Sequence, residues 1–364
     1  MDNMENIKWI KVDPETMDVY NVDKDYVRIP AHIAEKISRG VLGFSKCASG
    51  GRIRFATNTN QMYVRCELDV SWGQGFDLYK MVNGREHFKA TFRRDECIIH
   101  SGVFMSRKAE GHLQDSKEEH FYTMNFPTFG LIKSIEIGID EDATFKAGAE
   151  YVNKKPVVFY GSSITNGAQA SRPGMTYTAL ISQKYNLNYL NMGFAGSARG
   201  EEAMAEYLAN LEMSAFVCGY DHNAYEDGHL EKTHLALYKK IREKHPDIPY
   251  IMLTRPDYFS NVSLAEQRAG VIYENYEYAK SIGDKNVYFI HGKTFFEGEY
   301  YTNCTNDGCH PNDVGFMRMA CKIGPVIAKA MGLEVDFLHD TYLDERKSDK
   351  DDAKFTQPVD RCAM

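Results

Sequence analysis

The sequence lacks several features that mark particular protein classes. Its 364 residues contain no apolar run near the ~18 residues that a membrane-spanning helix requires. The start, MDNMENIKWIKVD, has no basic region followed by an apolar core, so no signal peptide is indicated. The eight cysteines form no CxxC pair, and we expect free thiols in a reducing cytoplasm.

Positive charge is also in short supply. Lys and Arg number 43 against 51 Asp and Glu, which gives a net charge of −8. This balance argues against a general nucleic-acid-binding protein. We therefore expect a cytoplasmic chain with neither nucleic acid nor membrane as partner, and the sequence leaves open whether it forms a homodimer.

The first part of the chain has the alternating pattern of apolar and polar residues that is typical of a β-sandwich. Length alone suggests two domains, and 43% hydrophobic residues are ordinary for a globular protein. Apolar and polar residues alternate in runs such as Arg52–Phe55, Tyr63–Val70 and Ser134–Ile139. A period of two predicts strands with one buried face. We expect an antiparallel, jelly-roll-like β-sandwich over residues 1–150.

From residue 156 the texture changes to alternating strands and helices. The wholly apolar runs that predict buried strands are Val157–Tyr160, Ala215–Cys218, Tyr250–Leu253 and Val287–Ile290. The helical patterns between and after them are Met175–Tyr185, Glu201–Asn210, Gly228–Glu243, Ser263–Ile282 and Asp313–Met331. This order predicts an α/β domain over residues 151–333, with a three-layer α/β/α arrangement around a parallel sheet.

The tail leaves two interpretations open. Asp344–Lys354 is a charge run that suggests a solvated segment. Val335–Leu338 has the pattern of a last strand, in which case residues 334–364 would complete the β-sandwich.

Four loops carry candidate chemistry, because parallel sheets bind ligands at the carboxyl ends of their strands. They are Gly161–Gly167, Asn191–Ser197, Gly219–Ala224 and Asn306–Asn312. A serine directly after a strand can present its hydroxyl at the sheet edge. Taken alone, however, Gly-Ser-Ser is equally expected as a helix start with one of the serines as N-cap.

Taken together and in this order, the four loops resemble the blocks of the SGNH (GDSL-type) hydrolases. Gly75–Tyr79 is similar to the GxDLY motif of an N-terminal β-domain that accompanies one SGNH subfamily, and Ala170–Gly174 matches the same subfamily. Two departures are Ser162, where Asp is usual, and Asp221-His222-Asn223 in place of G-x-N-D. The chain resembles carbohydrate esterase family seventeen, which acts on acetylated manno-oligosaccharides.

The resemblance implies a catalytic set for this chain. Ser163 would be the nucleophile, His310 the general base and Asp307 the carboxylate that orients it, an arrangement that activates a weakly nucleophilic hydroxyl. The Ser163 N–H, the Gly193 N–H and the Asn223 side chain would form the oxyanion hole. No metal and no organic cofactor are implied.

Six further residues are candidates for substrate contact: Ser162, Trp72, Arg172, Asp221, His222 and Arg255. For each a structural role is the competing interpretation. The arginines would brace loops, His222 would bond to backbone or to Asp221, and Trp72 would pack in the core.

A zinc site is a rival interpretation of Cys304, Asp307, Cys309 and His310. All four are ligand types, but the spacing C-x4-C-H fits no common zinc pattern and a second ligand pair is missing. We therefore expect no metal there.

The function that the resemblance implies is a serine esterase that removes O-acetyl groups from soluble oligosaccharides, with acetylated manno-oligosaccharides first among them. Two alternatives stay open. One is an acetyl xylan-type or broad small-ester esterase. The other is a lectin-like glycan-binding protein whose hydrolase domain is inactive.

Overall fold

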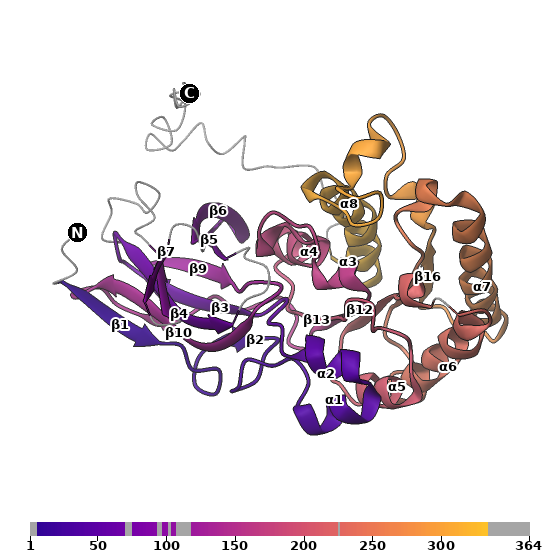
Figure 1. Ribbon diagram of the computed structural model, residues 1–364, viewed down its shortest axis with the longest axis horizontal. Coiled ribbons are helices and arrows are strands. Elements are labelled where there is room, and N and C mark those ends of the chain that lie inside the picture. Colours follow the sequence, from indigo (N-terminus) through magenta and orange to yellow (C-terminus); the bar gives the residue numbers. More distant parts are fainter. Residues whose placement is uncertain are drawn as a thin grey trace.

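The computed structural model describes residues 6–69, 75–92, 97–100, 103–106, 118–224 and 226–333. Trp72, the Val335–Leu338 pattern and the charge run after it lie outside the described residues. Figure 1 shows a part made of antiparallel strands beside a part made of a parallel sheet and helices. The expected fold class is confirmed.

The parallel sheet has five strands in the order β13-β12-β14-β15-β16. Their bounds are β12 (Val157–Gly161), β13 (Tyr189–Gly193), β14 (Ala215–Gly219), β15 (Tyr250–Leu253) and β16 (Val287–Ile290). The helices are α3 (Ser163–Asn166), α4 (Tyr177–Tyr185), α5 (Glu202–Ala209), α6 (His229–Lys244), α7 (Val262–Ser281) and α8 (Asp313–Ala330).

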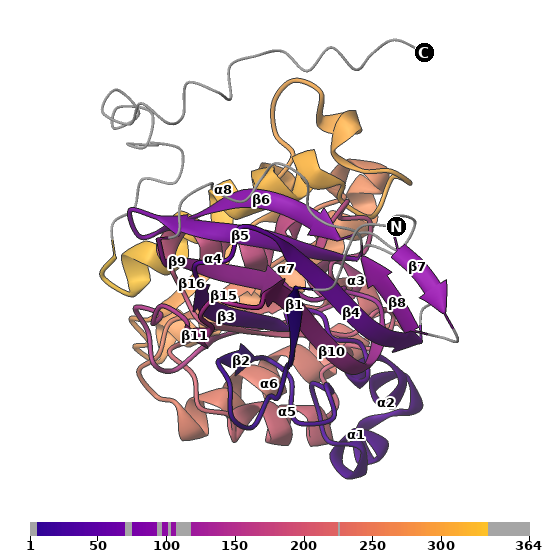
Figure 2. The same cartoon turned by 90° about the vertical axis from the view of Figure 1, so that its left-hand side faces the viewer.

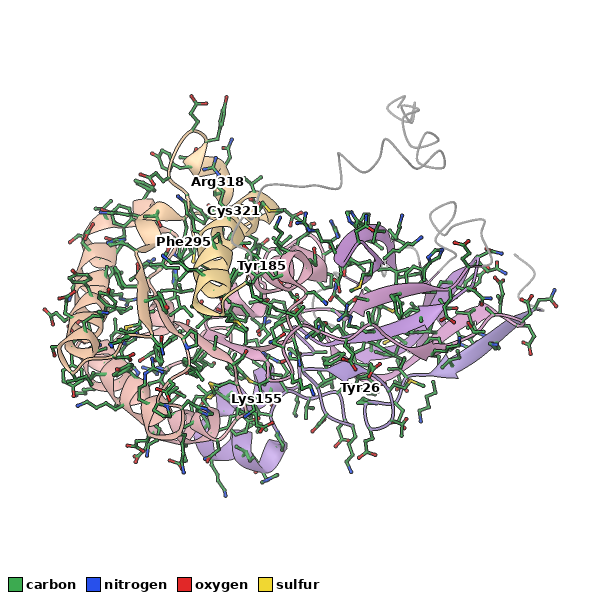
Figure 3. The ribbon with its side chains drawn as sticks, turned by 180° about the vertical axis from the view of Figure 1, so that it is seen from behind. Tyr26, Lys155, Tyr185, Phe295, Arg318 and Cys321 are labelled. Carbon is green, nitrogen blue, oxygen red and sulfur yellow. The ribbon has the colours of Figure 1, made fainter. Side chains whose placement is uncertain are left out.

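Alternation along β12 explains why the sheet is covered on both faces. Val157 and Phe159 belong to one core cluster, which includes residues of α4 and α8. Val158 and Tyr160 belong to the other, with α5, α6 and α7. Successive side chains of a strand point to opposite faces, so a wholly apolar strand requires two apolar layers. Seen from behind, α8 with Arg318 and Cys321 lies next to α4 with Tyr185 (Figure 3).

The strand order creates the crevice in which the candidate residues lie. β12 pairs in parallel with β13 on one side and with β14 on the other, so the chain changes direction across the sheet at β12. Ligands bind outside the carboxyl ends of the strands at such a switch point. Ser163 follows β12 directly, and Asn223 lies on the turn after β14.

The N-terminal part is a sandwich of two antiparallel sheets, with strand orders β1-β10-β4-β8-β7 and β11-β3-β9-β5-β6. β2 pairs with β3 in the second sheet. The strands of the first sheet are β1 (Ile7–Lys11), β4 (Met62–Asp69), β7 (Cys97–His100), β8 (Val103–Ser106) and β10 (Leu131–Asp140). Those of the second are β2 (Val19–Tyr20), β3 (Arg52–Thr57), β5 (Phe76–Val82), β6 (Arg85–Phe92), β9 (His120–Asn125) and β11 (Lys146–Ala147). Figure 2 shows the sandwich in front of the helices and the parallel sheet.

Two short helices from the N-terminal region belong to the core of the other part. α1 (Ala31–Ile37) and α2 (Arg39–Ser45) place Ala34 and Val41 in the cluster that includes β12, β14 and α5. The alternating pattern of residues 1–150 does not predict either helix as such, and the two glycines of α2 disfavour a helix. Ser38 caps α2 by accepting a hydrogen bond from the Val41 N–H at 3.2 Å. Tertiary packing therefore overrides propensity here.

The GxDLY motif joins the sandwich to the hydrolase part. Asp77 is fully buried, and its Oδ2 accepts a hydrogen bond from the Gly174 N–H at 2.8 Å. The same oxygen forms an ion pair with Arg172 at 3.3 Å. Arg172 also donates to the Tyr79 hydroxyl and lies 4.0 Å over the Phe88 ring. These contacts favour the structural interpretation of Arg172, whose guanidinium is engaged with the sandwich.

The buried Asp77 should make stability depend on pH. Burial raises the pKa of Asp77 from 3.8 to about 6, although donors from Asn125, Arg172 and Gly174 oppose the shift. The folded protein thus binds this proton more tightly than the unfolded chain. Its stabilising contribution is complete below about pH 4 and is lost as the pH rises through about 6. A shift of this size corresponds to about 3 kcal/mol.

Asp77→Asn cannot titrate at this position and removes that dependence. We expect the free energy of unfolding of the wild type to fall by about 3 kcal/mol relative to Asp77→Asn between pH 4 and pH 7. Urea unfolding of both proteins across this range measures the difference, in which the titration of unaffected groups cancels. Identical pH dependence in the two proteins would contradict the assignment.

Among the described residues, no helix has the length and apolar character needed to cross a membrane.

Candidate active site

Ser163, His310 and Asp307 form one hydrogen-bonded chain at the carboxyl edge of the sheet. The Ser163 Oγ lies 2.9 Å from His310 Nε2, and His310 Nδ1 lies 2.7 Å from Asp307 Oδ2. A carboxylate only accepts hydrogen bonds, so Nδ1 carries the proton and Nε2 accepts from the serine hydroxyl. This polarity is what general-base activation of a serine requires.

Asp307 is held by the loop that it begins. Its Oδ1 accepts hydrogen bonds from the backbone N–H groups of Cys309 at 2.9 Å and His310 at 2.7 Å. Burial alone would raise the pKa of Asp307, but these donors and the histidine ring lower it overall. The lowered pKa favours the ionised carboxylate, which is the form that accepts the Nδ1–H hydrogen bond. Three residues of spacing suffice because both groups share one tight turn.

Ser162 has a structural role, contrary to its prediction as a substrate contact. Its side chain is buried, and its Oγ accepts a hydrogen bond from the Ile164 N–H at 3.2 Å. It is the N-cap of α3, while Ser163 is the first residue of that helix. The two serines therefore have different roles: Ser162 caps α3, and Ser163 lies within hydrogen-bonding distance of His310.

The prediction of Gly193 as an oxyanion donor is wrong. Its N–H donates to Asn191 Oδ1 at 3.0 Å, and the residue is buried at the end of β13. A side chain at this position would collide with the backbone of Thr165 and Asn166 in α3. Gly193 is therefore explained by close packing of strand against helix, and not by a free amide.

Gly196, which the sequence interpretation missed, lies on the same loop and fits the role better. It is exposed and has a φ of 64°, a conformation that favours glycine. Its N–H, like that of Ser163, donates to no group within the described ranges. The available signal was the second glycine of Asn191-x-Gly193-x-x-Gly196, which falls beyond the strand.

Asn223 is tied to this loop. Its side-chain Nδ2 donates to the Phe194 carbonyl oxygen at 3.1 Å. The turn that carries Asn223 is fixed from below, because Asp221 Oδ2 accepts a hydrogen bond from the Arg255 N–H at 2.9 Å. Asp221 is only 1% exposed, so its prediction as a substrate contact is also wrong.

His222 and Arg255 meet at one buried carboxylate, which the sequence interpretation did not single out. Asp257 Oδ1 lies 2.7 Å from His222 Nε2 and accepts from Arg255 Nε at 2.8 Å, while Asp257 Oδ2 accepts from the same guanidinium. Burial would raise the pKa of Asp257, but these two partners hold it well below its usual range. Both predicted substrate contacts are thus engaged in bracing the loop.

The described residues place one other potential ligand set together, and it differs from the zinc set considered above. Ligand atoms of His222, Asp257 and Cys309 lie within 4.8 Å of one another. The carboxylate of this set is already paired with Arg255. Burial and the nearby carboxylates raise the pKa of the Cys309 thiol to about 11. The set is accounted for as a neutralised ion pair beside a protonated thiol.

A groove of about 400 Å³ adjoins the turn that contains Asp307. Its aromatic walls are Phe259, Phe296 and Tyr301, and Asn306 and Gly308 form its border with the catalytic turn. Phe259 and Tyr301 are 46% and 43% exposed, with ring centroids 4.5 Å apart. Exposed aromatic faces next to the turn of the catalytic carboxylate can hold the part of a substrate that is not being cleaved.

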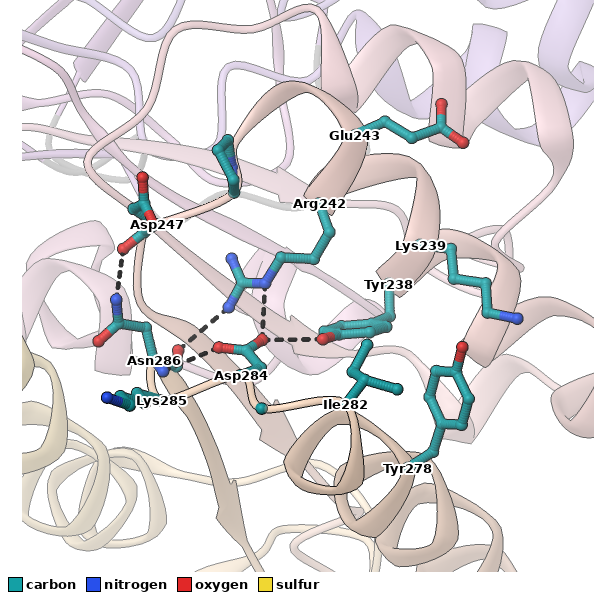
Figure 4. Close-up of a pocket in the computed structure, with 12 residues that line it drawn as sticks. Tyr238, Lys239, Arg242, Glu243, Asp247, Tyr278, Ile282, Asp284, Lys285 and Asn286 are labelled. Carbon is teal, nitrogen blue, oxygen red and sulfur yellow. Dashed lines mark hydrogen bonds and ion pairs between the residues drawn. The ribbon is translucent and has the colours of Figure 1, made fainter.

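A second hollow lies between the carboxyl-terminal ends of α6 and α7, at the opposite edge of the sheet (Figure 4). Asp284 Oδ2 accepts hydrogen bonds there from Arg242 Nε and the Tyr238 hydroxyl, each at 2.8 Å. Arg242 also donates to three backbone carbonyl oxygens. These groups satisfy one another and brace the two helix ends.

A serine–histidine–carboxylate triad at the switch point of an α/β/α sheet is the site of a serine hydrolase, and the protein is an esterase of that class. Residues 154–328 match the GDSL-like Lipase/Acylhydrolase family. Residues 7–145 match the family described as the N-terminus of Esterase_SGNH_hydro-type, or GxDLY. The protein is a GDSL/SGNH-type hydrolase with an N-terminal GxDLY domain.

Solved structures have a similar fold. A Bacteroides ovatus protein assigned as a GDSL-like lipase has 27% identity and a TM-score of 0.77, covering 91% of this chain and 100% of that chain. The salicylyl-acyltransferase SsfX3 from a tetracycline biosynthetic pathway has 17% identity and a TM-score of 0.69, covering 91% and 98%. A Clostridium thermocellum family two carbohydrate esterase has 16% identity and a TM-score of 0.55, covering 79% and 94%. No curated protein matches the sequence.

Proposed function

We propose that this esterase removes O-acetyl groups from soluble oligosaccharides, with acetylated manno-oligosaccharides as the preferred class. The observation that carries the proposal is the hydrogen-bonded chain from Ser163 through His310 to Asp307, a residue whose two sequence neighbours, Asn306 and Gly308, line an aromatic-walled groove. The three hydrogen-bonded residues supply the groups that cleave an ester. The groove offers aromatic faces and polar rims of the kind that suit a sugar ring.

Acylation begins when Ser163 Oγ attacks the acetyl carbonyl carbon while His310 Nε2 takes the hydroxyl proton. Asp307 stabilises the resulting imidazolium through Nδ1–H. The N–H groups of Ser163 and Gly196 and the Asn223 amide stabilise the oxyanion. The C–O bond to the sugar then breaks, His310 returns its proton to the sugar oxygen, and an acetyl-serine remains.

Deacylation repeats the sequence with water. His310 takes a proton from a water molecule, the hydroxide attacks the acetyl carbonyl, and the bond to Ser163 Oγ breaks. The serine regains its proton from His310, and acetate leaves. The partial exposure of the His310 and Asp307 side chains, 27% and 42%, gives water access to the acyl-enzyme and favours hydrolysis over transfer to another acceptor.

Phe259→Ala tests the groove as the place of the sugar. We expect kcat/KM for an acetylated manno-oligosaccharide to fall about fivefold to tenfold through a higher KM, because a ring face worth about 1 kcal/mol is lost. Hydrolysis of 4-nitrophenyl acetate, which has no sugar, should stay near the wild-type rate. Tyr273→Ala is the matched control, since Tyr273 is 47% exposed on α7. Equal losses on both substrates would contradict the assignment of the groove as the sugar-binding site.

The substrate class itself is tested by a product-resolved time course. Acetylated manno-oligosaccharides, acetylated xylo-oligosaccharides and simple aryl esters are compared by kcat/KM, with acetate release as the readout. Preference for the manno-oligosaccharides supports the proposal. A ratio near one across the panel would favour a broad small-ester esterase, and glycan binding without acetate release would favour a lectin-like protein.

A further inference from the structure

A guanidinium from the N-terminal region is buried beneath the loops that carry the proposed oxyanion donors. Arg28 is 4% exposed, and each of its N–H groups has an acceptor. Nε donates to the Cys47 carbonyl oxygen at 2.8 Å, and Nη1 donates to those of Asn191 at 2.9 Å and Gly193 at 2.7 Å. Nη2 donates to the Phe44 carbonyl oxygen at 2.7 Å and to Asn166 Oδ1 at 3.1 Å.

The acceptors belong to the segments that present the reacting groups. Asn166 is the last residue of α3, whose first residue is Ser163. Gly193 ends β13 and leads into the loop with Phe194 and Gly196. The guanidinium also lies 4.8 Å from the centre of the Phe194 ring, and the Phe194 carbonyl accepts the Asn223 amide. One planar group thus connects the helix of the nucleophile with the oxyanion loop.

The charge has no acidic partner among the residues that the structure describes. Its hydrogen-bond acceptors are carbonyl and amide oxygens. Burial lowers the pKa of Arg28 to about 10, although the nearby Cys47 and Tyr207 side chains oppose the shift. Burying a charge in this way is expensive for folding. A lysine ammonium has three donors on a single nitrogen atom. It therefore cannot reproduce the planar, five-donor geometry of the guanidinium.

We propose that Arg28 is a positioning residue for the hydrolytic reaction: its guanidinium fork sets the distance between α3 and the Phe194–Gly196 loop, and with it the geometry of the oxyanion hole. The inference rests on the proposed function, because the oxyanion loop is defined by it. The N-terminal region would then be part of the catalytic scaffold.

Arg52 provides a matched control in the same chain. It is also buried, at 1% exposure, and also comes from the N-terminal region. It donates to the Tyr189 carbonyl oxygen at 3.2 Å and to Asn188 Oδ1 at 2.9 Å, so it holds the start of β13, whereas Arg28 holds its end. Both arginines support the same strand, but only Arg28 reaches α3 and the oxyanion loop.

The experiment compares Arg28→Gln, Arg28→Lys and Arg52→Gln in the full chain. A fluorophosphonate probe titrates competent Ser163 sites, and kcat for 4-nitrophenyl acetate is expressed per titrated site, so that loss of folded protein does not count. We expect kcat per site to fall about 10- to 100-fold in both Arg28 variants with KM within about threefold, because misplacement of reacting groups costs rate rather than binding. Arg52→Gln should stay within about threefold of wild type in both constants.

Binding of a boronic acid, which mimics the tetrahedral intermediate, gives a second readout. Its affinity should weaken in the Arg28 variants by a factor similar to the loss in kcat, and stay unchanged in Arg52→Gln. Equal kcat per site in Arg28→Gln and Arg52→Gln, or recovery of wild-type kcat in Arg28→Lys, would overturn the positioning role. Absence of esterase activity in the wild type would instead overturn the proposed function, so the two failures are distinguishable.

Discussion

Replacement of Ser163 by alanine is expected to lower kcat for 4-nitrophenyl acetate and for acetylated oligosaccharides by about 10⁴-fold or more. The alanine has no oxygen to attack the carbonyl, and the donors that remain can assist only a slow attack by water. KM should change little, since the Ser163 hydroxyl lies 2.9 Å from His310 and contributes to chemistry rather than to holding the sugar. Initial rates of acetate release measure the effect.

Ser162→Ala is the control for that result. Ser162 Oγ accepts from the Ile164 N–H and caps α3, so its loss should cost about 1 kcal/mol of stability. We expect kcat to remain within about tenfold of the wild type. The opposite pattern, with activity lost in Ser162→Ala and kept in Ser163→Ala, would refute the assignment of the nucleophile.

Loss of the His310 imidazole should be nearly as damaging as loss of the serine. His310→Ala removes the base that takes the Ser163 proton and the acid that protonates the leaving sugar oxygen, and members of such a chain act as one unit. We expect kcat to fall by about 10⁴-fold or more. The double variant with Ser163→Ala should be no slower than either single variant, and full additivity of the two losses would contradict a shared role.

Asp307→Ala separates orientation from proton transfer. It removes the acceptor of the His310 Nδ1–H at 2.7 Å and of two backbone N–H groups in the same turn. We expect a smaller loss of kcat than in His310→Ala, because the imidazole itself remains. Asp307→Asn keeps the shape of the turn and distinguishes loss of charge from loss of loop structure. An equal and complete loss in all three variants would show that the carboxylate is indispensable.

The parallel sheet was predictable because its signal is local. The runs Tyr250–Leu253 and Val287–Ile290 are strands with the bounds that their apolar residues indicate. α2 was not predictable, since its two glycines disfavour a helix and its Val41 is buried in a core cluster shared with distant elements, β12, β14 and α5. The local sequence pattern identifies a helix or strand when its buried residues recur with the period of that element. It fails when the element is stabilised by packing against residues that are distant in the sequence.

The same distinction applies to the site. Ser163 was identified from a short motif on one loop, and His310 and Asp307 were identified from a second motif that they share. Gly193 was mistaken for the donor because a sequence does not show which glycine ends the strand and which follows it. Arg172 and Arg255 resemble sugar contacts until their partners Asp77 and Asp257 are seen.

Arg28 had no sequence signal at all. It acts across about 160 residues of chain, on Asn191 and Gly193, and no motif surrounds it. Its partners are mostly backbone carbonyl oxygens, which every residue carries, so no pattern of side chains could point to it. Such a contact becomes visible only when the N-terminal region and the parallel sheet are placed together.

The most direct test of the central claim is to trap the acyl-enzyme. Wild-type protein is mixed with an acetyl ester, quenched with acid during the first turnover and digested, and the peptides are examined by mass spectrometry. We predict one acetyl group on Ser163, none in Ser163→Ala, and none on Ser162. Acetate release with no acetylated serine, or with the acetyl group on another residue, would contradict this prediction.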